Sequence, residues 1–205
     1  MTVANPPVPL DDQVRDAYLR VSHAFEGARE DRARLYADYL QFFTPDDLVL
    51  DFGCGDGTWL ELAAGRGIRS LGIDYDPEKV AACHSRGLDA ICSSQLTDAA
   101  GYSPTALTAF HIIEHLAPMD VMRLLMTLDV SKVILVTPNI DHPPVLSNFW
   151  RDVTHVRPYP RDVMEVMCRE AGFAGVVSGT QNHEWDSWVF AWKRGTPSWP
   201  DPAQG

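Results

Sequence analysis

Short apolar runs alternate with stretches of helical periodicity along most of the chain. Seven apolar runs are predicted to be strands, near residues 48–52, 69–74, 88–92, 105–110, 132–137, 173–179 and 186–193. Helices are predicted between them, near residues 57–66, 77–86, 118–129 and 160–171. Because this alternation favours a doubly wound arrangement, we expect an α/β, Rossmann-like fold with a mostly parallel seven-stranded sheet. The last two runs have no helix between them and predict an antiparallel hairpin at the sheet edge.

The two ends of the chain differ from this central pattern. Residues 11–43 show helical periodicity and are predicted to form two helices separated by Gly27. Their apolar stripes need a partner, so residues 1–43 are expected to act as an N-terminal helical lid. Residues 195–205 contain Gly, Pro and Trp and predict a loose tail. The length of 205 residues suits a single domain with a full core.

Composition and charge narrow the classes of partner. The chain is 45% hydrophobic and 22% charged, which is typical of a soluble globular protein. Its net charge of −11 and its lack of a basic run argue against binding to nucleic acid. No apolar run reaches the roughly 18 residues that a membrane span needs. The four cysteines have no C-x-x-C spacing, so they indicate neither a zinc site nor a disulfide framework and favour a cytoplasmic location.

A glycine-rich stretch follows the first predicted strand and precedes a helix. Gly53, Gly55 and Gly57 form a G-x-G-x-G spacing, with Asp51 just before it. Asp74 ends the next strand about 20 residues later, where a carboxylate can accept both hydroxyls of a ribose. Alone, the glycines could mark only a tight turn; with Asp74, they predict a site for a nucleoside-bearing cofactor. A short-chain oxidoreductase is disfavoured, because the spacing is not G-x-G-x-x-G and no paired Tyr and Lys are found at catalytic separation.

This pair of motifs resembles motif I and the following acidic strand end of the class I S-adenosylmethionine-dependent methyltransferases. The resemblance implies S-adenosylmethionine as the cofactor. It also implies a set of cofactor-binding residues, namely Arg29, Asp51, Phe52, Gly53, Gly55, Asp74, Tyr75, Ser94 and Phe110.

A second constellation follows the fourth predicted strand. His111, Glu114 and His115 form an H-x-x-E-H sequence that also occurs in zinc peptidases, where both histidines lie on one continuous helix. Here the motif directly follows a strand, and Pro118 starts a new helix just after it, so the peptidase interpretation is disfavoured. Histidines that merely fill a loop are the second alternative. Because further polar and aromatic residues follow the next strand, we expect an active site at the carboxyl edge of the sheet.

Four segments narrow the resemblance to the methyltransferases of bacterial polysaccharide and O-antigen gene clusters. These segments are residues 25–30 (F-x-G-x-R-E), 110–116, 137–139 and 152–158 (D-x-T-H-x-R-P), and the resemblance covers roughly residues 20–175. It implies O-methylation of a sugar or oligosaccharide hydroxyl. The chain departs from the family at 93–95, where an acid is often found, and at 130–132, where a proline-glycine pair is missing.

The resemblance also implies roles near the acceptor. Glu114, His115 and His155 match residues that hold a divalent cation, Mg or Mn, in some methyltransferases. His142 is the first candidate for the base and His111 the second. The alternative without metal makes His115 a base that Glu114 orients. An inactive binding module, a non-sugar acceptor and a homodimer stay open at this point.

Overall fold

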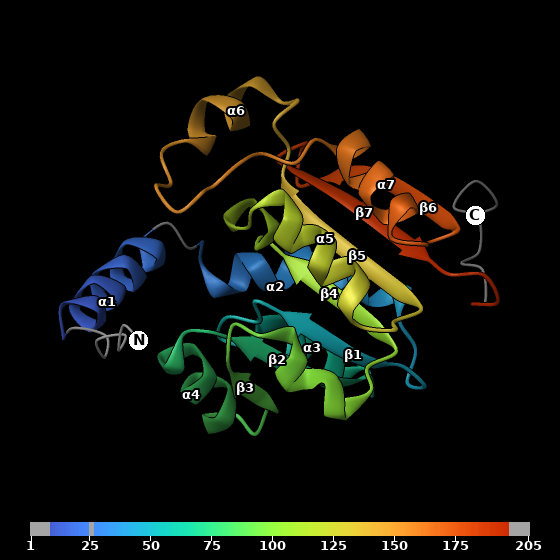
Figure 1. Ribbon diagram of the computed structural model, residues 1–205, viewed down its shortest axis with the longest axis horizontal. Coiled ribbons are helices and arrows are strands. Elements are labelled where there is room, and N and C mark those ends of the chain that lie inside the picture. The colour runs from blue at the N-terminus through green and yellow to red at the C-terminus, as the bar shows by residue number, and fades with distance from the viewer. Residues whose placement is uncertain (1–8, 25–26, 197–205) are drawn as a thin grey trace, which may run out of the picture.

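The computed structural model describes residues 9–24 and 27–196, which form one sheet with helices on both faces (Figure 1). Phe25 and Glu26 of the F-x-G-x-R-E segment, and residues 197–205 of the expected tail, lie outside the described residues. The strands are β1 (Leu48–Phe52), β2 (Arg69–Asp74), β3 (Ala90–Cys92), β4 (Ala106–Phe110), β5 (Lys132–Pro138), β6 (Gly175–Gln181) and β7 (Asp186–Trp192). Their order in the sheet is β3-β2-β1-β4-β5-β7-β6, and only β7 runs antiparallel to its neighbours. The predicted Rossmann-like sheet, with its antiparallel hairpin at one edge, is confirmed.

The helices follow the predicted places closely, with additions in the loops. The helices are α1 (Pro9–His23), α2 (Arg29–Ala37), α3 (Thr58–Gly65), α4 (Pro77–Ser85), α5 (Pro118–Thr127), α6 (Pro143–Phe149) and α7 (Arg161–Glu170). Short 3-10 helices are η1 (Asp38–Phe42), η2 (Leu96–Tyr102) and η3 (Ile113–His115). Helix α6 was not predicted, because Pro143 and Pro144 at its start resemble a loop. Both prolines are tolerated in the first turn, where no backbone N–H is needed.

The central strands are buried on both faces, which explains their continuous apolar sequences. On one face, Leu107 and Leu135 pack with Leu124 of α5 and Met164 of α7. On the other face, an aromatic cluster from η1, α3 and the sheet includes Phe42, Trp59, Phe110 and Phe190. Both layers hold the sheet rigidly, so the loops at its carboxyl edge start from fixed positions.

The strand order reverses between β1 and β4, and ligands of doubly wound sheets bind at this point. Helix α1 lies beyond that edge of the sheet and covers neither face (Figure 1). Because β7 is antiparallel, its first residue, Asp186, pairs with Pro138 at the carboxyl end of β5. Asp186 therefore reaches the same edge as the loops after β1 and β4.

Within the described ranges, no helix is both long enough and apolar enough to cross a bilayer.

Candidate active site

A cavity of about 1020 Å³ opens at the carboxyl edge of the sheet. Its walls come from the loops after β1, β2, β3 and β4, from α1 and α2, and from the segments after α6 and before β7. The predicted residues that line it are Asp51, Phe52, Gly53, Gly55, Asp74, Tyr75, Ser94, Phe110, His111, Glu114, His115 and His155. This volume can hold a nucleoside cofactor together with a second molecule.

The glycine loop is shaped by backbone conformations that favour glycine. Gly53, Gly55 and Gly57 have φ values of +75°, +53° and +77°. A Cβ on Gly53 would lie 2.7 Å from Cγ1 of Ile112, in the loop after β4. The Gly55 N–H donates to the Asp74 carboxylate at 2.8 Å, which joins the loop after β1 to the end of β2. The two predicted motifs are therefore one structural unit.

Two carboxylates lie at the ends of β1 and β2. Asp51 is 2% exposed and accepts a hydrogen bond of 2.7 Å from the Thr108 hydroxyl. Burial raises the pKa of Asp51 to about 7. Asp74 also accepts the backbone N–H of Asp76 at 2.9 Å, and burial raises its pKa as well. Each oxygen of Asp74 thus accepts one backbone N–H and keeps a lone pair for a ligand hydroxyl.

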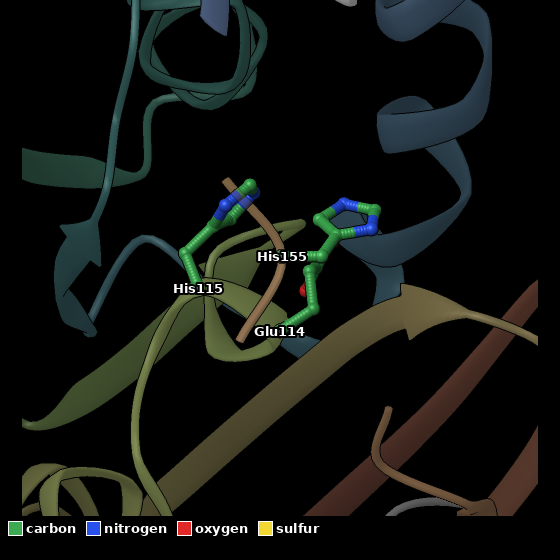
Figure 2. A group of neighbouring side chains, drawn as sticks. All are labelled: Glu114, His115 and His155. Atoms are coloured by element: carbon green, nitrogen blue, oxygen red, sulfur yellow. The ribbon is translucent and has the colours of Figure 1, made fainter. Parts of the chain in front are cut away.

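Glu114, His115 and His155 come together from two segments that are distant in sequence (Figure 2). One potential ligand atom from each lies within 4.8 Å of the other two. Nδ1 of His115 is 3.1 Å from the Thr154 carbonyl oxygen, and Nδ1 of His155 is 2.7 Å from that of Phe149. If each Nδ1–H donates to its carbonyl, Nε2 of both rings keeps a lone pair that can bind a metal.

Glu114 is the buried member of this cluster, with 1% of its surface exposed. Its Oε2 accepts a hydrogen bond of 3.0 Å from the Thr137 hydroxyl. Burial opposes its ionisation, but the hydrogen bond with His111 and the charges of His111 and His115 lower its pKa below the usual value. Glu114 is therefore a carboxylate at neutral pH, as a metal ligand has to be.

His111 lies between two carboxylates and has the left-handed φ of +51°. Its Nδ1 is 3.5 Å from Glu114, and its Nε2 is 3.6 Å from Asp186. Burial lowers the pKa of His111, but the Glu114 hydrogen bond and the Asp186 charge outweigh it and raise the pKa. Sequence reasoning missed Asp186, although the predicted hairpin places the start of the last strand at this edge.

His142 is placed differently. It precedes α6 as its N-cap residue, and its ring meets that of Trp185 with 6.0 Å between centroids. Its Nδ1 is 3.7 Å from Glu184. His142 is not among the described residues that line the cavity, whereas Trp185 is.

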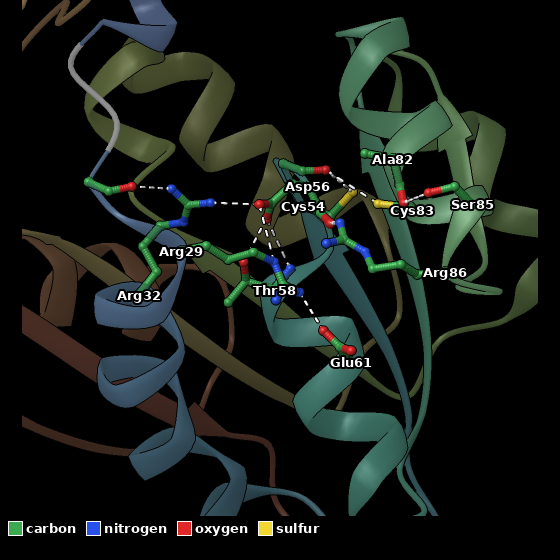
Figure 3. Close-up of polar contacts among 12 residues, drawn as sticks. Arg29, Arg32, Cys54, Asp56, Thr58, Glu61, Ala82, Cys83, Ser85 and Arg86 are labelled. Carbon is green, nitrogen blue, oxygen red and sulfur yellow. Dashed lines mark hydrogen bonds and ion pairs between the residues drawn. The ribbon is translucent and has the colours of Figure 1, made fainter.

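Two of the three arginines of α2, Arg29 and Arg32, contact the glycine loop and the helix after it (Figure 3). Arg29 pairs with Glu61 and lies 3.4 Å from Asp56, and it does not line the described part of the cavity. Arg32 donates to Asp56 at 2.9 Å and to the Gly27 carbonyl at 2.6 Å, and it does line the cavity. These residues lie three apart on one helix, so the sequence pattern alone could not separate their roles.

Helix α1 closes one side of the cavity with Tyr18, Leu19 and His23. Nε2 of His23 is 2.7 Å from the carboxylate of Asp76, which follows β2. The side chain of Tyr18 lies near Thr154, one residue before His155. One helix therefore touches both the loop beside Asp74 and the segment that carries His155.

Comparisons with known proteins agree with this geometry. Residues 28–178 match a family model described as a methyltransferase domain. None of the curated proteins compared with the chain matches it.

Solved structures share the fold. An S-adenosylmethionine-dependent methyltransferase from Archaeoglobus fulgidus has a TM-score of 0.74 and 23% identity, over 86% of this chain and 99% of that one. A protein from Pyrococcus horikoshii has a TM-score of 0.65 and 14% identity, over 83% and 93%. A candidate O-methyltransferase from Nostoc punctiforme has a TM-score of 0.60 and 18% identity, over 80% of this chain and 56% of its own longer chain.

Proposed function

The chain belongs to the class I S-adenosylmethionine-dependent methyltransferases, and from this premise we propose that it methylates a hydroxyl of a sugar or oligosaccharide with the help of a divalent cation. The observation that carries the proposal is the convergence of Glu114, His115 and His155 in the same cavity as the glycine loop and Asp74. A hydroxyl is a very weak acid, so its methylation gains from a cation or a base beside the oxygen.

S-adenosylmethionine supplies an electrophilic methyl group on a positively charged sulfur when it is bound. Asp74 is suited to accept the two ribose hydroxyls, since both of its oxygens are already oriented by backbone N–H groups. The bare backbone around Gly53 and Gly55 lets the cofactor approach without a Cβ in the way. Arg32 replaces Arg29 in our proposal as the cation that faces the cofactor's carboxylate, because Arg32 lines the cavity.

A divalent cation fits the residues of the acceptor half. Two imidazoles and one buried carboxylate suit Mn or Zn, and they accept Mg if water supplies further oxygen ligands. A cation held by Glu114, His115 and His155 would lower the pKa of an acceptor hydroxyl and orient its oxygen. The chain contributes the preset orientation of the ligands, through the contacts of both Nδ1 atoms with backbone carbonyls.

The acceptor's proton needs a base in the cavity. We assign this role to His111 before His142, because His111 lines the cavity beside Glu114 whereas His142 contacts Trp185 and Glu184. In this assignment His111 would accept the proton of the acceptor hydroxyl as the oxygen bonds to the methyl carbon, and the sulfur of the donor would keep the electron pair of the broken bond. Asp186 holds the other side of the His111 ring.

The proposal of a sugar acceptor rests on the D-x-T-H-x-R-P segment and on the aromatic and polar residues that line the cavity near Trp185. Trp185 is 40% exposed and lines the cavity together with Asn148 and Arg151. An aromatic face beside amide and guanidinium donors suits a molecule with apolar C–H faces and many hydroxyls.

A product-mass screen tests this function. The protein with S-adenosylmethionine and Mn²⁺ is incubated with a panel of oligosaccharides, phenols and carboxylic acids. We expect the mass of at least one oligosaccharide to increase by one CH₂ group, and Glu114→Gln to abolish the product while Glu170→Gln, an exposed change on α7, keeps it. Methylation of phenols or carboxylic acids alone would contradict the sugar class, and a fully active Glu114→Gln variant would contradict the cation.

A further inference from the structure

Tyr36, near the end of α2, lies at the boundary between the two halves of the cavity. Its side chain is 8% exposed and lines the cavity. Its ring stacks on Phe110, with 4.6 Å between centroids and 20° between planes, and lies 6.4 Å from the His111 ring. In the part of the chain that the structure describes, the Tyr36 hydroxyl makes no hydrogen bond, and the ring is held by stacking and by apolar packing in the core.

Three carboxylates and one arginine act on this ring. Burial raises the pKa of the Tyr36 hydroxyl, the charge of Arg32 opposes the rise, and the charges of Asp51, Glu114 and Asp186 add to it. The side chain is therefore a neutral phenol at any physiological pH. A neutral ring among carboxylates offers a favourable environment to a cation that carries no hydrogen-bond donor.

The order of groups along the cavity indicates that this cation is the sulfonium of the cofactor. Asp74 marks the ribose end, and Glu114 with its histidines marks the acceptor end. The sulfur of the cofactor has to lie between its ribose and the acceptor oxygen, because the methyl group moves from one to the other. Tyr36 occupies this middle part, since it stacks on Phe110 and its ring neighbour His111 contacts Glu114.

We propose that Tyr36 is a positioning residue whose ring faces the sulfonium of S-adenosylmethionine and distinguishes the charged donor from its neutral product, S-adenosylhomocysteine. An aromatic ring attracts a cation but not a neutral thioether of nearly the same shape. This preference orients the methyl group before transfer and weakens the hold on the cofactor afterwards. The inference rests on the proposed function, since Glu114 and its histidines mark the acceptor end, but its test needs neither an acceptor nor a metal.

Calorimetric binding of the two ligands tests the inference. In Tyr36→Leu, which removes the ring, we expect the Kd of S-adenosylmethionine to rise about 5- to 30-fold, and that of S-adenosylhomocysteine by less than about twofold. Tyr36→Phe keeps the ring and should keep the wild-type ratio of the two constants. An equal loss for both ligands in Tyr36→Leu would overturn the inference while leaving methyl transfer itself intact.

Tyr39→Leu is the matched control. Tyr39 belongs to the same aromatic cluster, with its ring 5.4 Å from Phe110, and it is 2% exposed, but it is not among the described residues that line the cavity. Its loss disturbs the packing in a similar way and should leave the ratio unchanged. The same change of ratio in Tyr39→Leu would assign the effect to packing and refute the inference.

A measurement on the wild-type protein covers the case in which Tyr36→Leu does not fold. S-adenosylmethionine labelled with ¹³C in its methyl group is observed by NMR, free and bound. A ring that faces the sulfonium shifts the bound methyl resonance upfield, and Tyr36→Phe keeps that shift. A bound methyl resonance at the position of the free cofactor would overturn the inference.

Discussion

Asp51 carries an ionisable group into the centre of the fold. It is the penultimate residue of β1, is 2% exposed and has the Thr108 hydroxyl as its hydrogen-bond donor. The motif predicts an acid at this position, but Thr108 comes from β4, and the pairing of β1 with β4 brings the two together. A buried carboxylate with one neutral donor and Asp74 as a nearby negative charge is hard to ionise.

The stability of the protein without cofactor should therefore depend on pH through Asp51. Its pKa is about 7 in the folded protein, against a usual value of 3.8. A raised pKa means that the folded state binds the proton more tightly, so this contribution is fully present below about pH 4 and is lost as the pH rises through about 7. Asp51→Asn cannot ionise and still accepts from Thr108. From urea denaturation, we expect the free energy of unfolding of the wild type to fall relative to Asp51→Asn by on the order of 2–4 kcal/mol across this range.

A constant difference between Asp51→Asn and the wild type over the same pH range would show that Asp51 does not titrate there. Asp46→Asn, an exposed change in the turn before β1, is the control and should follow the wild type.

Individual residues of the site could be predicted only where their position follows from the sequence next to them. Gly53 and Asp74 directly follow or end strands, and the structure places both in the cavity. Arg32 and Tyr36 could not be assigned, because a helical period indicates a buried stripe but not what the stripe faces. Asp186 depends on a pairing between distant strands.

Helix α1 is the element whose role is least tied to the core. It begins at Pro9, ends at His23 and contacts the rest of the chain at both ends of the cavity, through Asp76 and Thr154. Val14, Tyr18 and Val21 keep 57%, 41% and 39% of their surface exposed. The expected lid stays a prediction, and these contacts support it, because closure over a ligand would cover apolar surface.

Removing residues 1–24 tests the lid. The deletion spares α2, with Arg32 and Tyr36, and every strand, so the far-UV circular dichroism and the cooperativity of unfolding should persist. We expect the Kd of S-adenosylmethionine to rise about tenfold, since His23 and Leu19 no longer close the cavity. The point variant His23→Ala, which removes only the contact with Asp76, should lie between the deletion and the wild type. Unchanged affinity in both variants would show that α1 is not a lid.

Helices and strands could be predicted where apolar residues recur at a regular spacing in the sequence. β5 is apolar from Val133 to Val136, and β4 is buried throughout with Thr108 as its one polar residue, which made both strands clear. Helix α6 and the segment after it have no such period, yet they place His155 beside His115. The acceptor half was therefore accessible only through motif resemblance, and the structure was needed to bring its parts together.

At the level of the whole molecule, the residues that we assign to the cofactor, the cation and the base all lie at the carboxyl edge of the sheet. The order β3-β2-β1-β4-β5-β7-β6 puts the cofactor loops on one side of the switch point and the acceptor groups on the other. Solved structures at 14% to 23% identity share this fold, and a fold by itself does not specify the acceptor. In our proposal, the acceptor is selected by the loops after β4 and α6 and by the turn before β7.

Turnover in the presence of a chelator, measured together with cofactor affinity, tests the central claim most directly. The protein is treated with EDTA, assayed for methyl transfer to the acceptor found in the mass screen, and then given back Mn²⁺ or Mg²⁺. We predict that EDTA abolishes turnover, that either cation restores it, and that the Kd of S-adenosylmethionine stays unchanged throughout, because none of the three proposed cation ligands belongs to the residues that we assign to the cofactor. Turnover that continues undiminished in EDTA would contradict the account and make His115 or His111 a base that acts without metal.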